Sequence, residues 1–188
     1  METIERKYIV YNYDELSEDA KERALEKLYD INVDFGEWYD SDSYAEKAKE
    51  YGVEILMSEA SFDLDRGDFL YFETYNHQSK PNYRKGISVI DDRKFMQKAG
   101  IRWRSVYTDS LTIDHKHYSG GSGANTIECS AELKGEQEGQ MTACLEELIG
   151  ELLSMLRKDY EYLTSREAIE ETIRANEYTF LENGQLFF

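Results

Sequence analysis

Residues 137–163 read QEGQMTACLEELIGELLSMLRKDYEYL, and this stretch decides the fold. Its large apolar side chains recur every three or four positions: Leu145, Leu148, Ile149, Leu152, Leu156, Tyr160 and Leu163. That spacing places them on one face of a helix, which must be buried against other elements. The pattern therefore predicts one long helix against which the rest of the chain packs.

The rest of the chain reads as short helices and strands joined by turns. Strands are predicted at residues 6–12, 53–64, 69–75, 101–108, 111–118 and 125–133, and in the tail 178–188. Shorter helices are predicted at residues 17–32 and 43–51, from Asp91 or Asp92 to Gly100, and from a cap at Thr164 to Ala175. Ser17 is a favourable N-cap, and Thr164 with Glu167 has the spacing of a capping box.

Turn residues join most of the strands into hairpins. Residues 65–68, the glycines at 120–123 and Asn183-Gly184 each separate two apolar runs, and glycine supplies the positive φ of tight turns. Because no strand–helix alternation is sustained, we expect an α+β fold. It would be an antiparallel sheet built from hairpins, packed against one long and several shorter helices in a single domain over residues 1–188.

Composition excludes several classes of protein. The 15 Tyr and 8 Phe among 188 residues argue against disorder. No run of about 18 apolar residues predicts a membrane span, and residues 1–10 lack the apolar core of a secretory signal. The two cysteines, Cys129 and Cys144, are too few for a disulfide scaffold. We therefore expect reduced thiols and a cytoplasmic location.

The charge is strongly acidic and unevenly distributed. The chain has 39 acids against 22 bases, a net charge of −17. Residues 1–77 hold 21 acids and 8 bases, and residues 106–188 hold 16 and 6. Such a field repels nucleic acid and attracts a basic groove of a protein that binds nucleic acid. The alternative is a surface that only keeps the chain soluble.

One stretch, residues 78–105, is basic, with 8 bases against 2 acids. Tyr83 and Trp103 are interleaved with the bases, as in nucleic-acid patches. The bases are Lys80, Arg84, Lys85, Arg93, Lys94, Lys98, Arg102 and Arg104. The interpretation we favour is that they pair with the surplus carboxylates, within the chain or across a homodimer, a state that the sequence leaves open.

Signals for an enzyme are weak. His115 and His117 share one face of a predicted strand, near Asp109 and Asp114, and a metal site there would need a further ligand such as His77. The chain has no phosphate-binding glycine loop, no Gly-x-Ser-x-Gly and no His-Glu-x-x-His. We therefore predict no catalytic residues, no metal and no cofactor. A metal-dependent enzyme that uses His115 and His117 is the weakest alternative.

Three segments resemble a family of small acidic proteins from phages and prophages, most of them uncharacterised and some labelled antitoxin-like. The opening, YDELSEDAK at 13–21 and DINVD at 30–34 with Ala24 and Trp38, is similar to the family's start. Arg66-Gly67-Asp68 resembles its turn, although residues 63–66 (DLDR) replace the family's aromatic-serine-glutamine run. YEYLTSREA at 160–168 and IRANEYTF at 173–180 resemble its closing segment.

The resemblance and the charge together predict a non-enzymatic phage inhibitor. It would bind a host defence protein that handles nucleic acid, such as the CRISPR effector Cas9, by mimicking nucleic acid, and would bind neither nucleic acid nor membrane itself. The alternative is an antitoxin that neutralises a basic toxin by direct contact. The expected docking strip follows the first helix and continues past it: Glu18, Glu22, Glu26, Asp30, Asp34, Glu37, Asp40 and Asp42.

Overall fold

The structure, a computed structural model, describes residues 7–34, 38–64, 69–72, 86–102, 113–116, 126–129 and 135–187, with the backbone alone at 113–116 and 126–129. Contacts divide the chain into two units, Met1–Tyr39 with Lys158–Phe188 (unit 1) and Asp40–Arg157 (unit 2). Both combine helices with antiparallel strands, which confirms the predicted α+β class. That residues 1–188 form a single domain stays a prediction.

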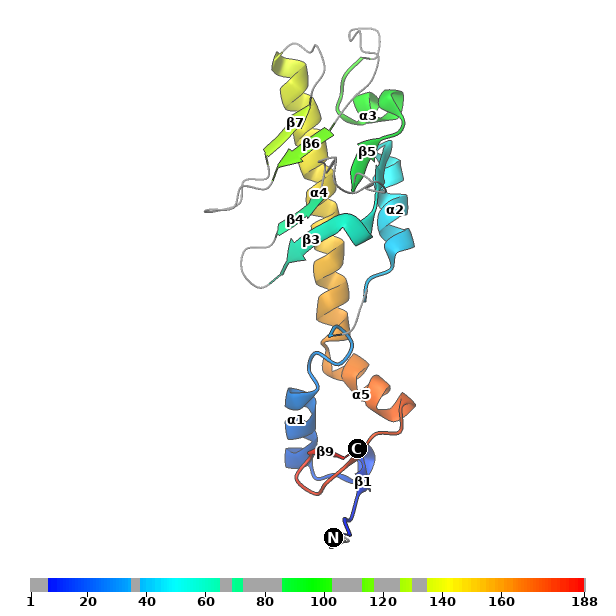
Figure 1. The fold of residues 1–188 in the computed structure, drawn as a ribbon, viewed down its shortest axis with the longest axis vertical. Helices are drawn as coiled ribbons and strands as arrows, with labels where there is room; N and C mark the ends of the chain where they lie inside the picture. The colour runs from blue at the N-terminus through cyan, green and yellow to red at the C-terminus, as the bar shows by residue number, and fades with distance from the viewer. Residues whose placement is uncertain are drawn as a thin grey trace, which may run out of the picture. The chain divides into compact units, whose positions relative to one another are not determined.

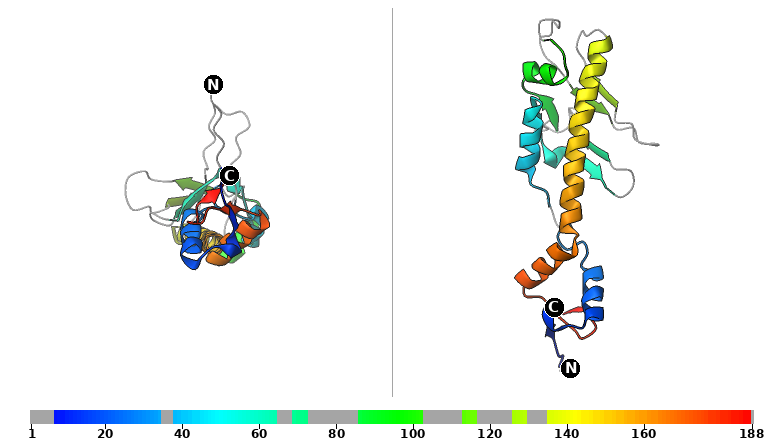
Figure 2. Two further views of the ribbon diagram at one scale, coloured as in Figure 1. Left: turned by 90° about the horizontal axis from the view of Figure 1, so that it is seen from below. Right: turned by 180° about the vertical axis from the view of Figure 1, so that it is seen from behind.

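Unit 2 is organised by helix α4 (Gly135–Leu163), whose residues up to Arg157 belong to this unit. Its buried side chains there follow the predicted stripe: Met141, Cys144, Leu145, Leu148, Ile149, Leu152 and Leu156. In Figure 1 the helix crosses behind the strands, and in the right view of Figure 2 it crosses in front of them, so it covers one face of the strands. The long helix and its packing face are confirmed.

The strands of unit 2 pair as three antiparallel ladders. The two predicted hairpins are confirmed: β3 (Ala60–Asp63) pairs with β4 (Phe69–Phe72), and β6 (Ile113–Lys116) with β7 (Thr126–Cys129). The third ladder joins β2 (Val53–Ile55) to β5 (Ile87–Val89).

The single strand predicted over 53–64 is wrong. A 3-10 turn, Met57–Glu59, interrupts it, and Met57 is buried. The Leu56 amide donates to the Gly86 carbonyl at 2.8 Å, which ends the β2–β5 ladder. Ile55, Leu56 and Met57 are consecutive apolar residues, and a flat strand buries only alternate side chains on one face. Ile55 and Met57 would share one face of an unbroken strand, and both are buried although the turn interrupts it.

Two short helices complete unit 2: α2 (Ser41–Glu50) and α3 (Asp92–Lys98). The Asp91 carboxylate accepts from the Lys94 amide at 2.9 Å, which confirms a cap at this position. Gly52 follows α2 with φ of +74°, and its carbonyl accepts from the amides of Ile90 and Asp91 at 2.9 and 3.0 Å. The strand predicted to begin at residue 101 is wrong for Ile101 and Arg102, since the Ile101 amide instead bonds the Met96 carbonyl and closes α3. Residues 103–112 lie outside the described chain.

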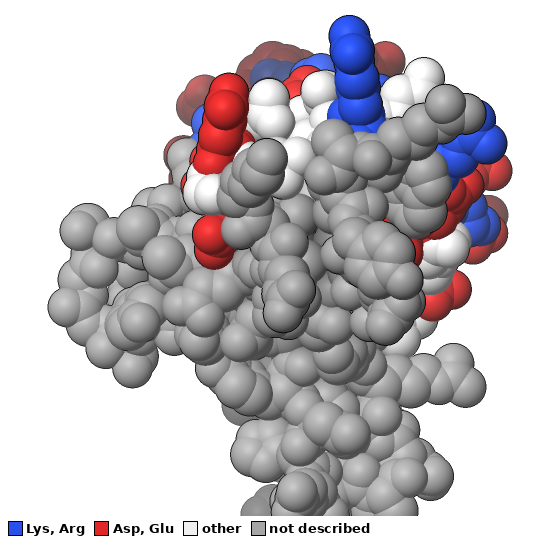
Figure 3. Space-filling view, turned by 90° about the horizontal axis from the view of Figure 1, so that it is seen from above, with Lys and Arg blue, Asp and Glu red and all other residues white. Residues whose placement is uncertain are grey.

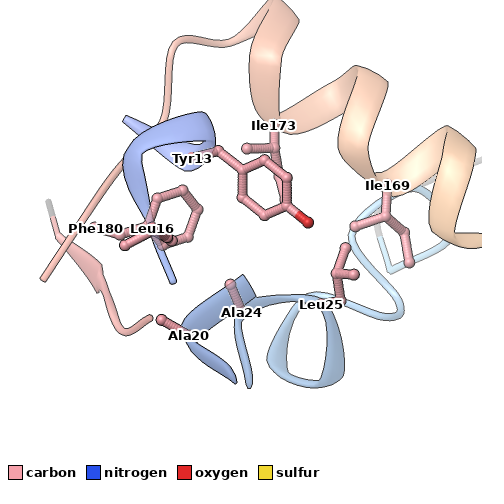
Figure 4. Packing of buried hydrophobic residues seen from close by; sticks show 8 residues of the cluster. All are labelled: Tyr13, Leu16, Ala20, Ala24, Leu25, Ile169, Ile173 and Phe180. Atoms are coloured by element: carbon pink, nitrogen blue, oxygen red, sulfur yellow. The ribbon is translucent and has the colours of Figure 1, made fainter. Parts of the chain in front are cut away.

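Unit 1 is formed by residues from both ends of the chain. Its elements are β1 (Tyr11–Asn12), the 3-10 turn η1 (Tyr13–Glu15), α1 (Glu18–Lys27), α5 (Arg166–Ala175), β8 (Thr179–Phe180) and β9 (Leu186–Phe187). The strands form an antiparallel sheet in the order β1-β8-β9. The buried cluster comes from both ends of the sequence (Figure 4): Tyr13, Leu16, Ala20, Ala24, Leu25, Ile169, Ile173 and Phe180.

The β8–β9 turn confirms the predicted Asn183-Gly184 hairpin. Gly184 has φ of +82°, a conformation that side chains with a Cβ rarely adopt. The Asn183 side chain accepts from the Gln185 amide at 3.0 Å. A Cβ at Gly184 would overlap the carbonyl oxygen of Ala20, so the turn lies directly against the first turn of α1.

Three predicted boundaries in unit 1 are wrong. The first strand is only Tyr11–Asn12. Helix α1 ends at Lys27 instead of residue 32: the amides of Ile31 and Val33 bond carbonyls three residues back, and the Asn32 side-chain amide donates to the Leu163 carbonyl at 2.9 Å. The cap of α5 is Ser165, since the Thr164 hydroxyl already donates to the Tyr160 carbonyl at 2.7 Å.

Candidate interaction surface

Helix α1 presents a row of carboxylates opposite its buried face. Ser17 caps the helix, its hydroxyl accepting from the Ala20 amide at 3.3 Å. Glu18, Glu22 and Glu26 are exposed and follow one another at four-residue spacing, which stacks their side chains along one side. We call these three residues the acidic ridge.

The remaining residues of the predicted strip do not belong to helix α1. Asp30 lies in the turn after α1, where its carbonyl accepts from the amides of Val33 and Asp34, both at 2.8 Å. Asp34 is exposed, and Glu37 lies outside the described residues. Asp40 caps α2 and Asp42 sits in its first turn, both in unit 2. The structure therefore brings three of the eight predicted residues into one helical row.

Helix α5 lies beside the ridge and carries a chain of alternating charges, which we call the charge ladder. Arg166 joins Glu22 of the ridge at 2.6 Å and Glu170 at 2.8 Å. Arg174 joins Glu170 and Asp14, each at 3.0 Å. The ladder thus links α1, α5 and η1 in the order Glu22, Arg166, Glu170, Arg174, Asp14.

Glu170 is the centre of the ladder. It also accepts from the Tyr13 hydroxyl at 3.1 Å. Partial burial alone would raise the pKa of Glu170, but the hydrogen bonds from Arg166, Arg174 and Tyr13 outweigh it and hold the pKa below its ordinary value. Burial, followed by the charge of Glu170 and the hydrogen bond to it, raises the pKa of Tyr13 to about 12. The carboxylate therefore stays charged, and the phenol protonated, at neutral pH.

Replacing Glu170 with glutamine is expected to lower the free energy of unfolding by about 1 kcal/mol at pH 7, because the ladder is largely exposed and exposed pairs contribute little. The folded-state pKa lies below the ordinary value of 4.5, so the stabilisation is present above that pH and is lost as the pH falls through the folded pKa. Urea unfolding at pH 7 and pH 3 should show the difference shrinking in acid. Glu171→Gln, at an exposed neighbour, should change stability at neither pH.

The charge ladder and its contact with the acidic ridge are absent from the predictions made from the sequence. The spacing of Arg166, Glu170 and Arg174 at four residues is visible in the sequence and predicts ion pairs along α5. The pair between Arg166 and Glu22 spans 144 residues of sequence, and no local pattern shows it. An exposed ion pair of this kind contributes about 0–1 kcal/mol.

Unit 1 has a surplus of acids beyond these pairs. Residues 7–34 and 158–187 together hold 15 acids and 7 bases. Within the part of the chain that the structure describes, several exposed carboxylates have no ion pair: Glu26, Asp34, Glu167, Glu171 and Glu177. Their charge remains available to a cationic partner.

An open groove of ≈ 650 Å³ lies next to the ladder, between η1 and the end of α5. Asp14, Glu15 and Glu177 contribute carboxylates to its lining, and Arg174 contributes a guanidinium. Glu177 has φ of +52° at the position after the helix where glycine is usual. The amide of the next residue, Tyr178, bonds back to the Ile173 carbonyl at 3.1 Å and closes the helix end.

Two lysines of the basic stretch 78–105 make contacts within unit 2. Lys94 donates to the Lys49 carbonyl at 2.5 Å, in the last turn of α2, and the Lys98 ammonium lies 4.5 Å from the centre of the Tyr51 ring. Figure 3 shows acidic and basic side chains next to one another on the described part of the face it views. These contacts within the chain favour a structural role for the two lysines. Lys80, Arg84, Lys85 and Arg104 lie outside the described residues.

Among the predicted histidine, aspartate and cysteine candidates, only some lie in the described part of the chain. His77, Asp109 and His117 lie outside the described residues, and His115 is described only by its backbone, in β6. Among the side chains that are described, no group of three or more His, Cys, Asp or Glu could hold a metal ion. Burial raises the pKa of Cys144 to about 11, so this buried thiol is protonated at neutral pH.

No described helix combines the length and the apolarity needed to cross a membrane. Comparison with protein-family models, with curated proteins and with solved structures gave no match.

Proposed function

We propose that this protein is a non-enzymatic acidic inhibitor that binds the basic groove of a host defence protein that handles nucleic acid. The observation that carries the proposal is the acidic surplus of unit 1. Glu18, Glu22 and Glu26 stand on one side of α1, and the only inter-helical ion pair described for the ridge, Glu22 with Arg166, is exposed. The phage-like segments make a defence protein such as a CRISPR effector the class of target.

The binding would follow from electrostatics more than from shape. Carboxylates four residues apart on a helix are separated by about 6 Å along its axis, so a basic groove would meet a row of negative charges. The weak exposed pairs of the ridge and the ladder would exchange their own cations for those of the partner. Complementary charge raises the association rate and makes affinity depend on salt.

Reversing two ridge charges is expected to weaken the partner complex by at least about 100-fold, which corresponds to roughly 2.7 kcal/mol. The variant is Glu18→Lys with Glu26→Lys, and it spares Glu22 so that the Arg166 pair survives. Glu46→Lys with Glu54→Lys makes the same change in net charge at exposed positions of unit 2. Binding isotherms with guide-bound Cas9 as the first target, at low and high salt, give the affinities, and circular dichroism reports the fold.

The two variants distinguish an effect of the acidic ridge from an effect of the net charge alone. Loss of binding in the ridge variant alone supports the acidic ridge as the binding site. Equal losses in both variants would show that only the net charge matters. Binding that survives high salt would contradict mimicry of nucleic acid. Rescue of cells from a basic toxin, without inhibition of any nucleic-acid-binding effector, would replace this proposal with the antitoxin. Bound transition metal in the purified protein would favour the enzyme that uses His115 and His117.

A further inference from the structure

The segment before β1, residues 7–10, is exposed and apolar and pairs with no described strand. Tyr8, Ile9 and Val10 expose 53%, 74% and 41% of their surface. In Figure 1 the segment, in dark blue, leads away from β1 and from the helices of unit 1. Within the described chain, residues 7–10 make no backbone hydrogen bond. A row of free amides and carbonyls flanked by apolar side chains is a template for strand pairing.

The segment itself contains no acid, although the protein is strongly acidic. Residues 7–13 contain no acid and one base, and residues 183–187 contain no charged side chain. The two stretches meet, since the rings of Tyr8 and Phe187 lie 5.3 Å apart. A partner with a net charge of −17 would meet two carboxylates here: Glu182, which shares a groove with Lys7, and Glu15, which already accepts from the Asn12 amide at 2.8 Å. A second copy of this chain is such a partner.

The sequence of this segment is also complementary to itself when two copies run antiparallel. When two copies of residues 7–11 (KYIVY) run antiparallel about a two-fold axis at Ile9, Ile9 faces Ile9 of the other copy. Tyr8 then faces Val10, and Lys7 faces Tyr11, so that no two like charges are opposed. Aromatic and β-branched cross-strand pairs stabilise sheets, and like charges directly opposite destabilise them. Side chains directly opposite lie on the same face of the sheet, as the two-fold axis requires.

We propose that two copies of this protein pair through residues 7–11, which are the segment before β1 and the first residue of β1. Since β1 is at one edge of the order β1-β8-β9, the pairing joins two three-stranded sheets into one of six strands. A two-fold interface of this kind closes on itself and stops at a dimer. The pairing segment shares no residue with the acidic ridge, so this proposal is independent of the proposed inhibitor site.

The dimer and the inhibitor complex are expected to depend on salt concentration in opposite ways. Two chains of net charge −17 repel one another, and salt screens that repulsion over about 8–10 Å. Added salt is therefore expected to strengthen the dimer, whereas it weakens binding of the acidic surface to a basic groove. One salt titration of each equilibrium tells the two interactions apart.

The test is sedimentation velocity from about 1 to about 300 µM, a range that resolves micromolar dissociation constants. We expect a concentration-dependent dimer that Ile9→Lys weakens by at least about 10-fold, without loss of helical circular dichroism. Ile90→Lys is the matched control, because Ile90 is 55% exposed and lies in unit 2. Hydrogen exchange above and below the midpoint should show protection of residues 8–10 only in the dimer.

The variant Ile9→Cys tests the register. In the proposed pairing the two introduced thiols face each other at a distance that a disulfide spans, so mild oxidation should link Ile9→Cys into dimers faster than Ile90→Cys. A protein that stays monomeric over the whole range overturns the proposal. So do open-ended aggregates, a dimer that Ile9→Lys leaves intact, or equal rates of cross-linking in the two cysteine variants.

Discussion

Replacing Gly184 with alanine is expected to lower the free energy of unfolding of unit 1 by about 3–5 kcal/mol. Two costs add at this residue. Its φ of +82° is unfavourable for any residue with a Cβ. The new methyl group would also overlap the carbonyl oxygen of Ala20, and this oxygen is held by the first turn of α1. Either the β8–β9 turn or the helix must move.

Gly100→Ala is the control that separates these two costs. Gly100 has φ of +73°, nearly the same backbone conformation, but a Cβ there would meet nothing within 4 Å. Its substitution is expected to cost only the conformational term, about 1–2 kcal/mol. Urea unfolding followed by circular dichroism measures both variants. Equal losses in the two would show that the turn does not rest on α1 as the structure has it.

Replacing Leu148 with alanine is expected to lower the free energy of unfolding of unit 2 by about 3–5 kcal/mol. Leu148 is fully buried in the middle of the stripe of α4. Truncation leaves a cavity among side chains from the strands and helices that α4 covers, and such a core relaxes only in part. Leu153→Ala on the same helix is the control, since Leu153 is half-exposed beside the stripe and should cost less than about 1.5 kcal/mol.

The Leu148 variant also tests the predicted single domain. If residues 1–188 unfold as one cooperative unit, hydrogen exchange should accelerate equally for the slowest amides of both units. Acceleration confined to Asp40–Arg157, with α1 and α5 still protected, would show two domains that unfold separately. Either result fixes how far the effect of a core substitution extends along the chain.

The two largest expected losses of stability are at Leu148 and Gly184, and the sequence predicts the reason for the first more fully than for the second. Leu148 belongs to an apolar repeat that predicts burial without any structure. Gly184 stands in an Asn-Gly pair that predicts a hairpin, and with it the positive φ. The approach of its Cα to Ala20, near the other end of the chain, is a contact between distant segments. Local chemistry predicts the conformation, and the overlap that makes substitution so costly depends on packing.

Elements with local sequence signals could be predicted before the structure was known. The face of α4 follows from side-chain spacing, the caps at Ser17 and Asp91 from hydroxyl and carboxylate groups one residue before a helix, and the β8–β9 hairpin from Asn183-Gly184. Tertiary structure alone decided which strands meet: β2 with β5, and β1 with β8 near the other end of the chain. It also decided that Arg166 reaches Glu22, so that the acidic ridge is partly neutralised. Helix caps and periodic faces are read within a few residues, whereas strand partners and long-range ion pairs depend on how the whole chain packs.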